Sequence, residues 1–115
     1  MVDVPVDRFK ELVADALDEI PDELWRLVDN LAVVVREGME GSSLLGLYDG
    51  IPLIDRGAGY DGMVLPDRIS IFRRPILALC ADEAEVVQQV RVTVIHEVAH
   101  HFGISDARLD ELGWA

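Results

Sequence analysis

The longest segment without a turn signal, residues 82–101, most constrains the fold of this chain. It is rich in valine, and residue propensity alone would favour a β-strand. A strand of about 20 residues would be unusually long, however. Apolar residues also recur every three or four positions, at Val87, Val90, Val94, Val98 and Phe102. The segment is therefore predicted to form a largely buried helix, with Asp82 as its N-cap and Gly103 as its stop.

Apolar spacing and turn residues predict the remaining elements. Helices are expected near both ends of the chain, over 9–20, 21–28 and 106–112, and a short one over 75–80. Strands are expected over 31–36, 44–48, 52–54 and 69–73, with a loop over 55–66. The strand 69–73 is either an exposed edge strand that captures an extended peptide or an interior strand. The pattern indicates one α+β domain over residues 1–115, in which a mixed sheet packs against the helix 82–101.

Charge and cysteine content exclude several classes of protein. The chain has 22 acidic and 10 basic residues, a formal net charge of −12, which argues against partners such as nucleic acids and anionic membrane surfaces. Its apolar runs are too short to span a bilayer, and the N-terminus lacks the pattern of a signal peptide. Cys80, the only cysteine, lies among apolar residues and is expected in the core. These features favour a cytoplasmic protein.

The sequence His-Glu-Val-Ala-His at 96–100 contains the residue types that bind a metal ion and transfer protons. Four residues on a helix turn through about 400°, so His96 and His100 project from nearly the same face. One ion can then accept both imidazole nitrogens at about 2.0–2.1 Å. Glu97 lies about 100° around the helix, where it can reach a water on that ion but not act as a further ligand. A carboxylate in that position can take the proton of the water as a general base.

A hydrolytic zinc site needs a third protein ligand. Gly103 can turn the chain sharply, so that Asp106 can swing back toward the ion. His101 is the rival, but it lies about 100° from His100 and about 140° from His96, too far round to join both. Asp106 is therefore the preferred third ligand, with capping of the last helix as its alternative role. His101 is expected to contact one of the metal ligands rather than the metal itself, or to make a contact at the surface.

Residues 96–106 fit the pattern H-E-x-x-H-x-x-G-x-x-D, and the stretches 44–48, 65–69 and 100–106 add to the likeness. From about Phe9 to Trp114 the chain resembles a family of minimal bacterial zincin-like metallopeptidases. The resemblance implies that His96, His100 and Asp106 bind Zn²⁺ and that Glu97 polarises the water. It also implies a zincin-like fold, with a small twisted sheet against an active-site helix.

The function predicted from these residues is a zinc-dependent metallopeptidase that acts on peptides or unfolded proteins. Only nine residues follow Asp106, and no methionine follows the metal motif, so neither a Met-turn nor a second cleft wall is expected. This favours, as an alternative, a zinc-stabilised binding module that docks a peptide or protein without catalysis.

Other polar side chains have two interpretations each. Tyr48 and Tyr60 could donate a hydrogen bond to an oxyanion, or could be structural. Arginines in the middle of the chain could hold a substrate carboxylate, or could pair with local acids: Arg68, Arg73 and Arg74.

Overall fold

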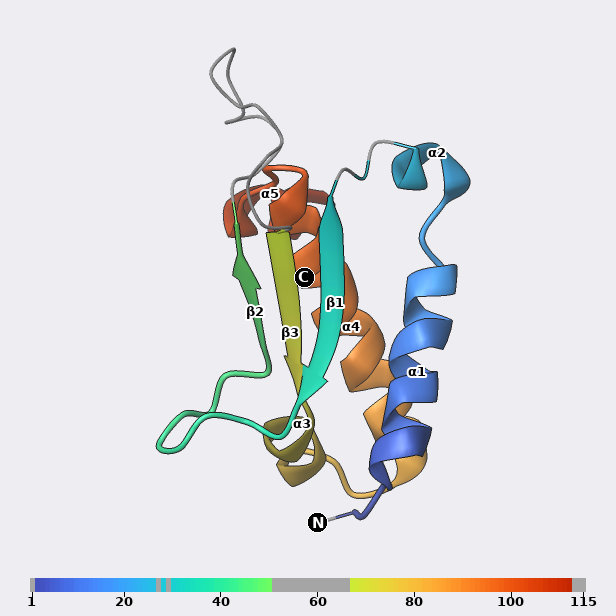
Figure 1. Cartoon of the computed structure of the whole chain (residues 1–115), viewed down its shortest axis with the longest axis vertical. Coiled ribbons are helices and arrows are strands. Elements are labelled where there is room, and N and C mark those ends of the chain that lie inside the picture. Colours follow the sequence, from blue (N-terminus) through green and yellow to red (C-terminus); the bar gives the residue numbers. More distant parts are fainter. Residues whose placement is uncertain (1, 27, 29, 51–66, 113–115) are drawn as a thin grey trace.

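The computed structural model describes residues 2–26, 28, 30–50 and 67–112. It shows an α+β arrangement in which a small mixed sheet is covered on one face by helices (Figure 1). None of the helices in these residues combines the length and apolar character needed to cross a bilayer.

The order of elements follows the predicted pattern closely. The helices are α1 (Val6–Asp18), α2 (Asp22–Trp25), α3 (Arg73–Ala78), α4 (Glu83–His101) and α5 (Asp106–Leu112). The strands are β1 (Leu31–Arg36), β2 (Gly46–Asp49) and β3 (Asp67–Phe72). The predicted helices at both chain ends are confirmed, while α3 begins two residues earlier than expected. The predicted strand 52–54 and loop 55–66 lie outside the described residues.

The sheet has the strand order β1-β3-β2. β1 pairs with β3 in parallel, with Val33 opposite Ile69, and β2 pairs with β3 antiparallel, with Tyr48 opposite the same residue. The prediction of a mixed sheet is thus confirmed. The edge-strand interpretation of residues 69–73 is wrong, because β3 is hydrogen-bonded to a neighbour on each side and Arg73 already belongs to α3.

Local contacts explain why the valine-rich segment is helical. The Asp82 carboxylate accepts a hydrogen bond from the Glu85 backbone N–H at 2.9 Å, and so caps α4 as predicted. The Glu85 carboxylate in turn accepts one from the Ala81 N–H at 2.9 Å. Burial of the valines against the rest of the protein offsets their modest cost in helix propensity.

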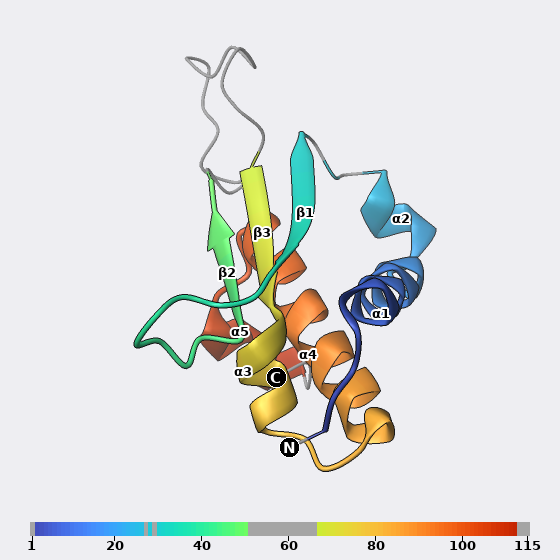
Figure 2. The same ribbon diagram turned by 60° about the horizontal axis from the view of Figure 1, so that its bottom comes forward.

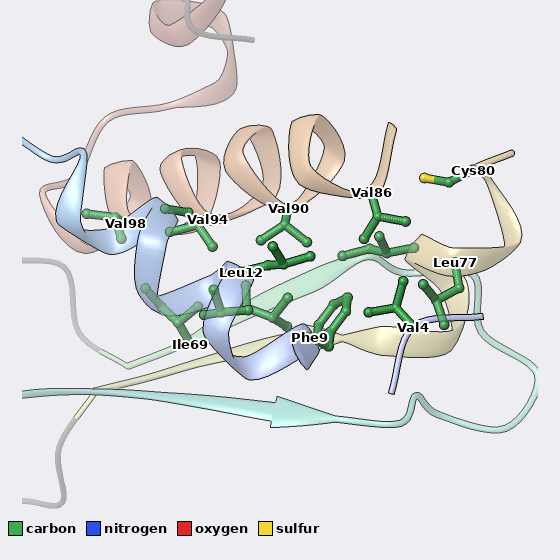
Figure 3. Close-up of a cluster of buried hydrophobic side chains, with 14 of the residues drawn as sticks. Val4, Phe9, Leu12, Ile69, Leu77, Cys80, Val86, Val90, Val94 and Val98 are labelled. Atoms are coloured by element: carbon green, nitrogen blue, oxygen red, sulfur yellow. The ribbon is translucent and has the colours of Figure 1, made fainter. Parts of the chain in front are cut away.

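The core lies between α1, α4 and the sheet. Figures 1 and 2 show α1 and α4 side by side across one face of the strands. Between them, Phe9 of α1, Val90 of α4 and Ile69 of β3 are completely buried (Figure 3). The cluster extends along α4 through three further buried valines, Val86, Val94 and Val98. This packing fixes α4 against the sheet over most of its length.

Removing the cap of α4 should destabilise the protein. Asp82→Ala is expected to lower the free energy of unfolding by about 1 kcal/mol, because the Glu85 N–H loses its acceptor. Urea titration followed by circular dichroism measures this loss. Asp15→Ala removes the same charge from an exposed position inside α1 and is the matched control. An equal loss in both variants would contradict the capping assignment.

Cys80 is buried, as predicted, with 5% of its surface exposed. Burial raises the pKa of its thiol, and the nearby carboxylates of Glu85 and Asp82 add to the rise. Since only the thiolate is nucleophilic, the folded protein at pH 8 should react with a disulfide reagent far more slowly than protein unfolded in urea. Equal rates in the two states would show that the thiol is accessible.

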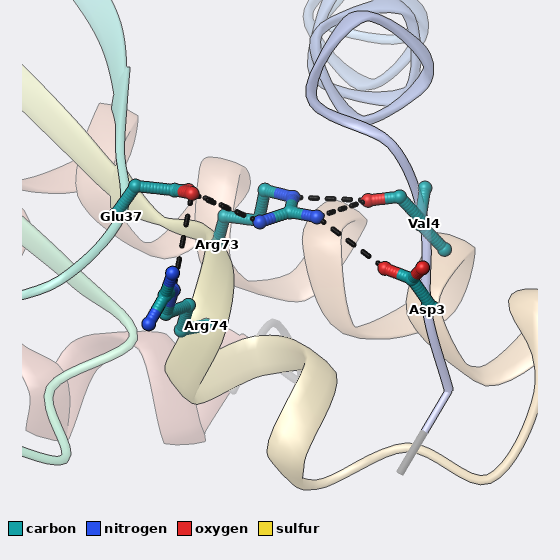
Figure 4. A network of polar contacts seen from close by, with 5 residues as sticks. All are labelled: Asp3, Val4, Glu37, Arg73 and Arg74. Carbon is teal, nitrogen blue, oxygen red and sulfur yellow. Dashed lines mark hydrogen bonds and ion pairs between the residues drawn. The ribbon is translucent and has the colours of Figure 1, made fainter.

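Arg73 joins three segments at the end of the sheet opposite α5 (Figures 1 and 4). Its Nε and Nη2 donate to the Val4 carbonyl oxygen at 2.9 and 2.7 Å, and its Nη1 donates to the Glu37 carboxylate at 3.0 Å. Asp3 lies 3.5 Å from Nη2. This arginine therefore pairs with local acids and ties the N-terminal segment to β1 and α3. The Arg74 Nε lies 3.9 Å from the same Glu37 carboxylate, and the Arg74 backbone N–H donates to the Glu37 carbonyl oxygen at 3.1 Å.

Candidate metal centre

The last two turns of α4 carry His96, Glu97 and His100. The two imidazole rings lie one turn apart, with their centroids 4.7 Å from each other, as the helical spacing predicts. Each ring is partly exposed, with 31% and 29% of the side-chain surface accessible. The three side chains can supply ligand atoms that all lie within 4.8 Å of one another.

The chain reverses direction immediately after α4. Gly103 has a φ of 83°, a left-handed conformation that glycine adopts without steric cost. Its N–H donates to the His100 carbonyl at 2.9 Å, and the Ile104 N–H donates to the Ala99 carbonyl at 3.0 Å. This pair of bonds is the Schellman motif, which satisfies the last carbonyls of a helix. The predicted stop at Gly103 is confirmed, and the turn directs α5 back toward the imidazoles.

Asp106, the first residue of α5, meets both rings. Its Oδ1 lies 3.0 Å from Nε2 of His96 and 2.9 Å from Nε2 of His100. In a tetrahedral zinc site with bonds of 2.0–2.1 Å, neighbouring ligand atoms are about 3.3 Å apart. The Asp106 oxygen is thus spaced from each imidazole nitrogen almost as two ligands of one small ion would be, and two imidazoles with one carboxylate suit zinc. His96, His100 and Asp106 therefore fit a zinc ion, the metal that the motif at residues 96–106 implies.

The capping alternative for Asp106 is wrong. The Arg108 N–H donates to the Ser105 hydroxyl at 3.2 Å, so Ser105 supplies the cap of α5. The Asp106 carboxylate is thereby available to the two imidazoles. Its hydrogen bond with His100 lowers the pKa of the Asp106 carboxyl, which favours the anionic form that a cation would bind.

Glu97 is buried beneath β2, with 7% of its surface exposed. Gly46 of β2 permits this approach, since a Cβ there would lie 2.8 Å from Thr93 Cγ2 and 3.1 Å from Glu97 Cγ. Burial raises the pKa of the Glu97 carboxyl, and the imidazoles of His100 and His96 oppose that rise only in part. One Glu97 oxygen lies 3.4 Å from Nδ1 of His100. The carboxyl is therefore held beside the imidazole pair in a partly dehydrated position.

His101 does not lie at the surface. It is completely buried, and its Nδ1–H donates to Oδ2 of Asp67 at 3.0 Å. The Tyr48 hydroxyl donates to the same oxygen at 2.5 Å, which favours the structural interpretation of Tyr48. The other tyrosine considered as an oxyanion donor, Tyr60, lies outside the described residues. Sequence reasoning missed Asp67, because a single carboxylate at the start of a buried strand leaves no periodic signal.

Comparison with known proteins agrees with this geometry. Residues 27–114 match the family described as zincin-like metallopeptidase. No match was found among curated proteins. The matched region covers well over half of the chain and includes β1, β2, β3 and all the side chains gathered at the end of α4. The chain therefore belongs to the zincin-like metallopeptidase family.

Proposed function

We propose that this protein is a zinc-dependent peptidase. His96, His100 and Asp106 hold the zinc ion, and Glu97 serves first as general base and then as general acid. The observation that carries the proposal is the convergence of one Asp106 oxygen on both Nε2 atoms at 2.9–3.0 Å. Three protein ligands are also the number that hydrolytic zinc sites use. When bound, zinc supplies Lewis acidity, which polarises a substrate carbonyl and makes water more acidic.

Glu97 transfers a proton from the attacking water to the leaving amine. Its carboxylate oxygen takes a proton as the oxygen of water forms a bond to the scissile carbonyl carbon. The same carboxyl then gives that proton to the amide nitrogen as the carbon–nitrogen bond breaks, so the products are a carboxylic acid and an amine. Its burial beneath β2 keeps Glu97 away from bulk water, which strengthens its interactions with the reacting groups.

β2 is the strand best placed to bind a substrate. Among the described residues it is hydrogen-bonded only to β3, so it forms an edge of the sheet there. Its helix-facing residue Gly46 lies directly over Glu97. An extended peptide that pairs with the main chain of β2 would therefore pass beside the reacting groups. Main-chain pairing requires an extended substrate, so unfolded segments are the proposed substrate class.

Removal and return of zinc test this function. Protein stripped with a chelator should cleave no unfolded substrate, such as reduced and alkylated casein, and addition of zinc should restore cleavage. Mass spectrometry of the fragments identifies the new N-termini. If fully zinc-loaded protein cleaves neither casein nor a random peptide mixture, the peptidase proposal fails.

A second candidate is a zinc-stabilised module that binds a peptide without cleaving it. It is favoured by exposed apolar side chains on and beside β2, because Leu44 and Leu47 expose 47% and 40% of their surface. Such side chains could cover a docked strand regardless of chemistry. Binding of a peptide that is recovered intact after long incubation with zinc-loaded protein would support the module over the enzyme.

A further inference from the structure

We infer that the side chains of Tyr48, Asp67 and His101, here called the Asp67 triad, position both the metal-binding turn of α4 and the β2 edge. This inference rests on the proposed function and adds two positioning links to it, the hydrogen bond between His101 and Asp67 and the hydrogen bond between Tyr48 and Asp67. The triad acts through α4, which carries the proposed zinc ligands His96 and His100, and through β2, the proposed peptide-binding edge.

The triad is a buried polar cluster. Asp67 exposes 3% of its surface and His101 none. One oxygen of Asp67, Oδ2, accepts from both partners, at 3.0 Å from Nδ1 of His101 and 2.5 Å from the Tyr48 hydroxyl. A buried carboxylate is costly unless it is hydrogen-bonded, so these bonds strongly favour the arrangement in which they form.

Each member of the triad comes from a different element. Asp67 begins β3, where its N–H also donates to the Asn30 carbonyl at 2.9 Å. His101 ends α4 and directly follows His100. Tyr48 lies on β2, two residues after Gly46 and on the same face of the strand. A single carboxylate thus joins the central strand to the proposed metal helix and to the proposed substrate edge.

Further contacts make this junction tight. A Cβ at Gly50, just beyond β2, would lie only 2.3 Å from Cγ of Asp67, so no larger residue fits over the carboxylate there. The Tyr48 ring meets the His100 and His101 rings edge-on, at centroid distances of 6.4 and 6.1 Å. Apolar packing alone would hold the same elements together but would tolerate sliding. Hydrogen bonds to one oxygen are directional and define one relative position.

The two links have different consequences. The bond between His101 and Asp67 fixes the rotation of the last turn of α4, and with it the aim of the His100 ring toward Asp106. The bond between Tyr48 and Asp67 fixes the height of β2 over Glu97. Breaking the first should change zinc affinity, whereas breaking the second should change peptide affinity.

Paired substitutions at His101 test the first link. His101→Leu replaces the imidazole by an apolar side chain of comparable size and so removes the hydrogen bond to Asp67, which should weaken zinc binding by roughly 10–100-fold. His101→Asn places an amide N–H near the position of Nδ1 and should restore most of the affinity. Competition with a chromophoric chelator measures both constants without requiring any catalysis. Unchanged zinc affinity in His101→Leu would overturn the first link.

Tyr48→Phe tests the second link. It removes only the hydroxyl, so KM for a peptide should rise by up to roughly tenfold while kcat and zinc affinity stay near the wild-type values. If the purified protein takes up zinc but cleaves no peptide, the peptidase proposal fails and the inference about the triad is not affected. The zinc measurements still decide the first link, and fluorescence anisotropy of a labelled peptide decides the second.

Val86→Ala is the matched control for general destabilisation. It removes buried volume from the opposite end of α4 and should lower the free energy of unfolding without changing zinc or peptide affinity. If Val86→Ala, Tyr48→Phe and His101→Leu all shift both affinities in proportion to lost stability, the triad is merely structural and the inference is overturned.

Discussion

Glu97→Gln is expected to lower the rate of peptide hydrolysis by about 10²–10⁴-fold, the usual contribution of a positioned general acid–base group. The amide has almost the same shape as the carboxylate, so it should fit beneath Gly46 equally well. It cannot accept the proton of the attacking water, however. Because Glu97 is not one of the three proposed ligands, zinc content should remain at the wild-type level.

The measurement is kcat/KM on one fluorogenic peptide, with zinc content determined on the same samples. Glu83→Gln is the control, since it makes the same change on an exposed residue at the start of α4, where Glu83 pairs with Arg8. Its activity should match the wild type. Cleavage by Glu97→Gln at the wild-type rate would rule out Glu97 as the base and point to a contaminating protease.

Zinc should stabilise the folded protein, and His100→Ala should abolish that effect. A ligand that binds only the folded state adds about 2.7 kcal/mol at a free concentration 100 times its Kd. For a domain of this size the corresponding rise in Tm is on the order of 10 °C. Without His100, Asp106 loses its partner at 2.9 Å and two candidate ligands remain, so the rise should vanish at the same zinc concentration.

Thermal melts with chelator and with added zinc measure this difference. Asp106→Asn should retain part of the rise, because both imidazoles remain and an amide oxygen is a weaker ligand. Gln88→Ala, an exposed change on the same helix, should show the full wild-type rise. A zinc-dependent rise of wild-type size in His100→Ala would show that zinc binds elsewhere on the protein.

Features set by short-range spacing were predictable from the residues. The alignment of His96 and His100 follows from helical geometry as soon as the segment 82–101 is taken as a helix. Asp82 and Gly103 mark the ends of that helix through capping bonds and left-handed backbone geometry, both of which are local. The return of Asp106 to the imidazoles follows from the same turn. The ligand triplet proposed here was therefore accessible without any tertiary contact.

Features set by pairing between distant segments were not predictable in this way. The apolar alternation of β3 fits an edge strand and a central strand equally, and only its two hydrogen-bonded neighbours decide between them. His101, which directly follows the proposed ligand His100, has no local sequence signal that distinguishes a buried side chain from an exposed one. Its partner Asp67 is 34 residues earlier in the chain.

The amino-acid sequence by itself determined the helix that carries the metal motif, the turn after that helix, and the three residues proposed as zinc ligands. Each of these features depends on contacts within a few positions of the chain. Only the tertiary structure decided that β2 lies over Glu97, that β3 is central and that Asp67 joins three elements. The physical reason is that strand order and buried polar pairing depend on which distant surfaces meet, and many arrangements share the same local pattern.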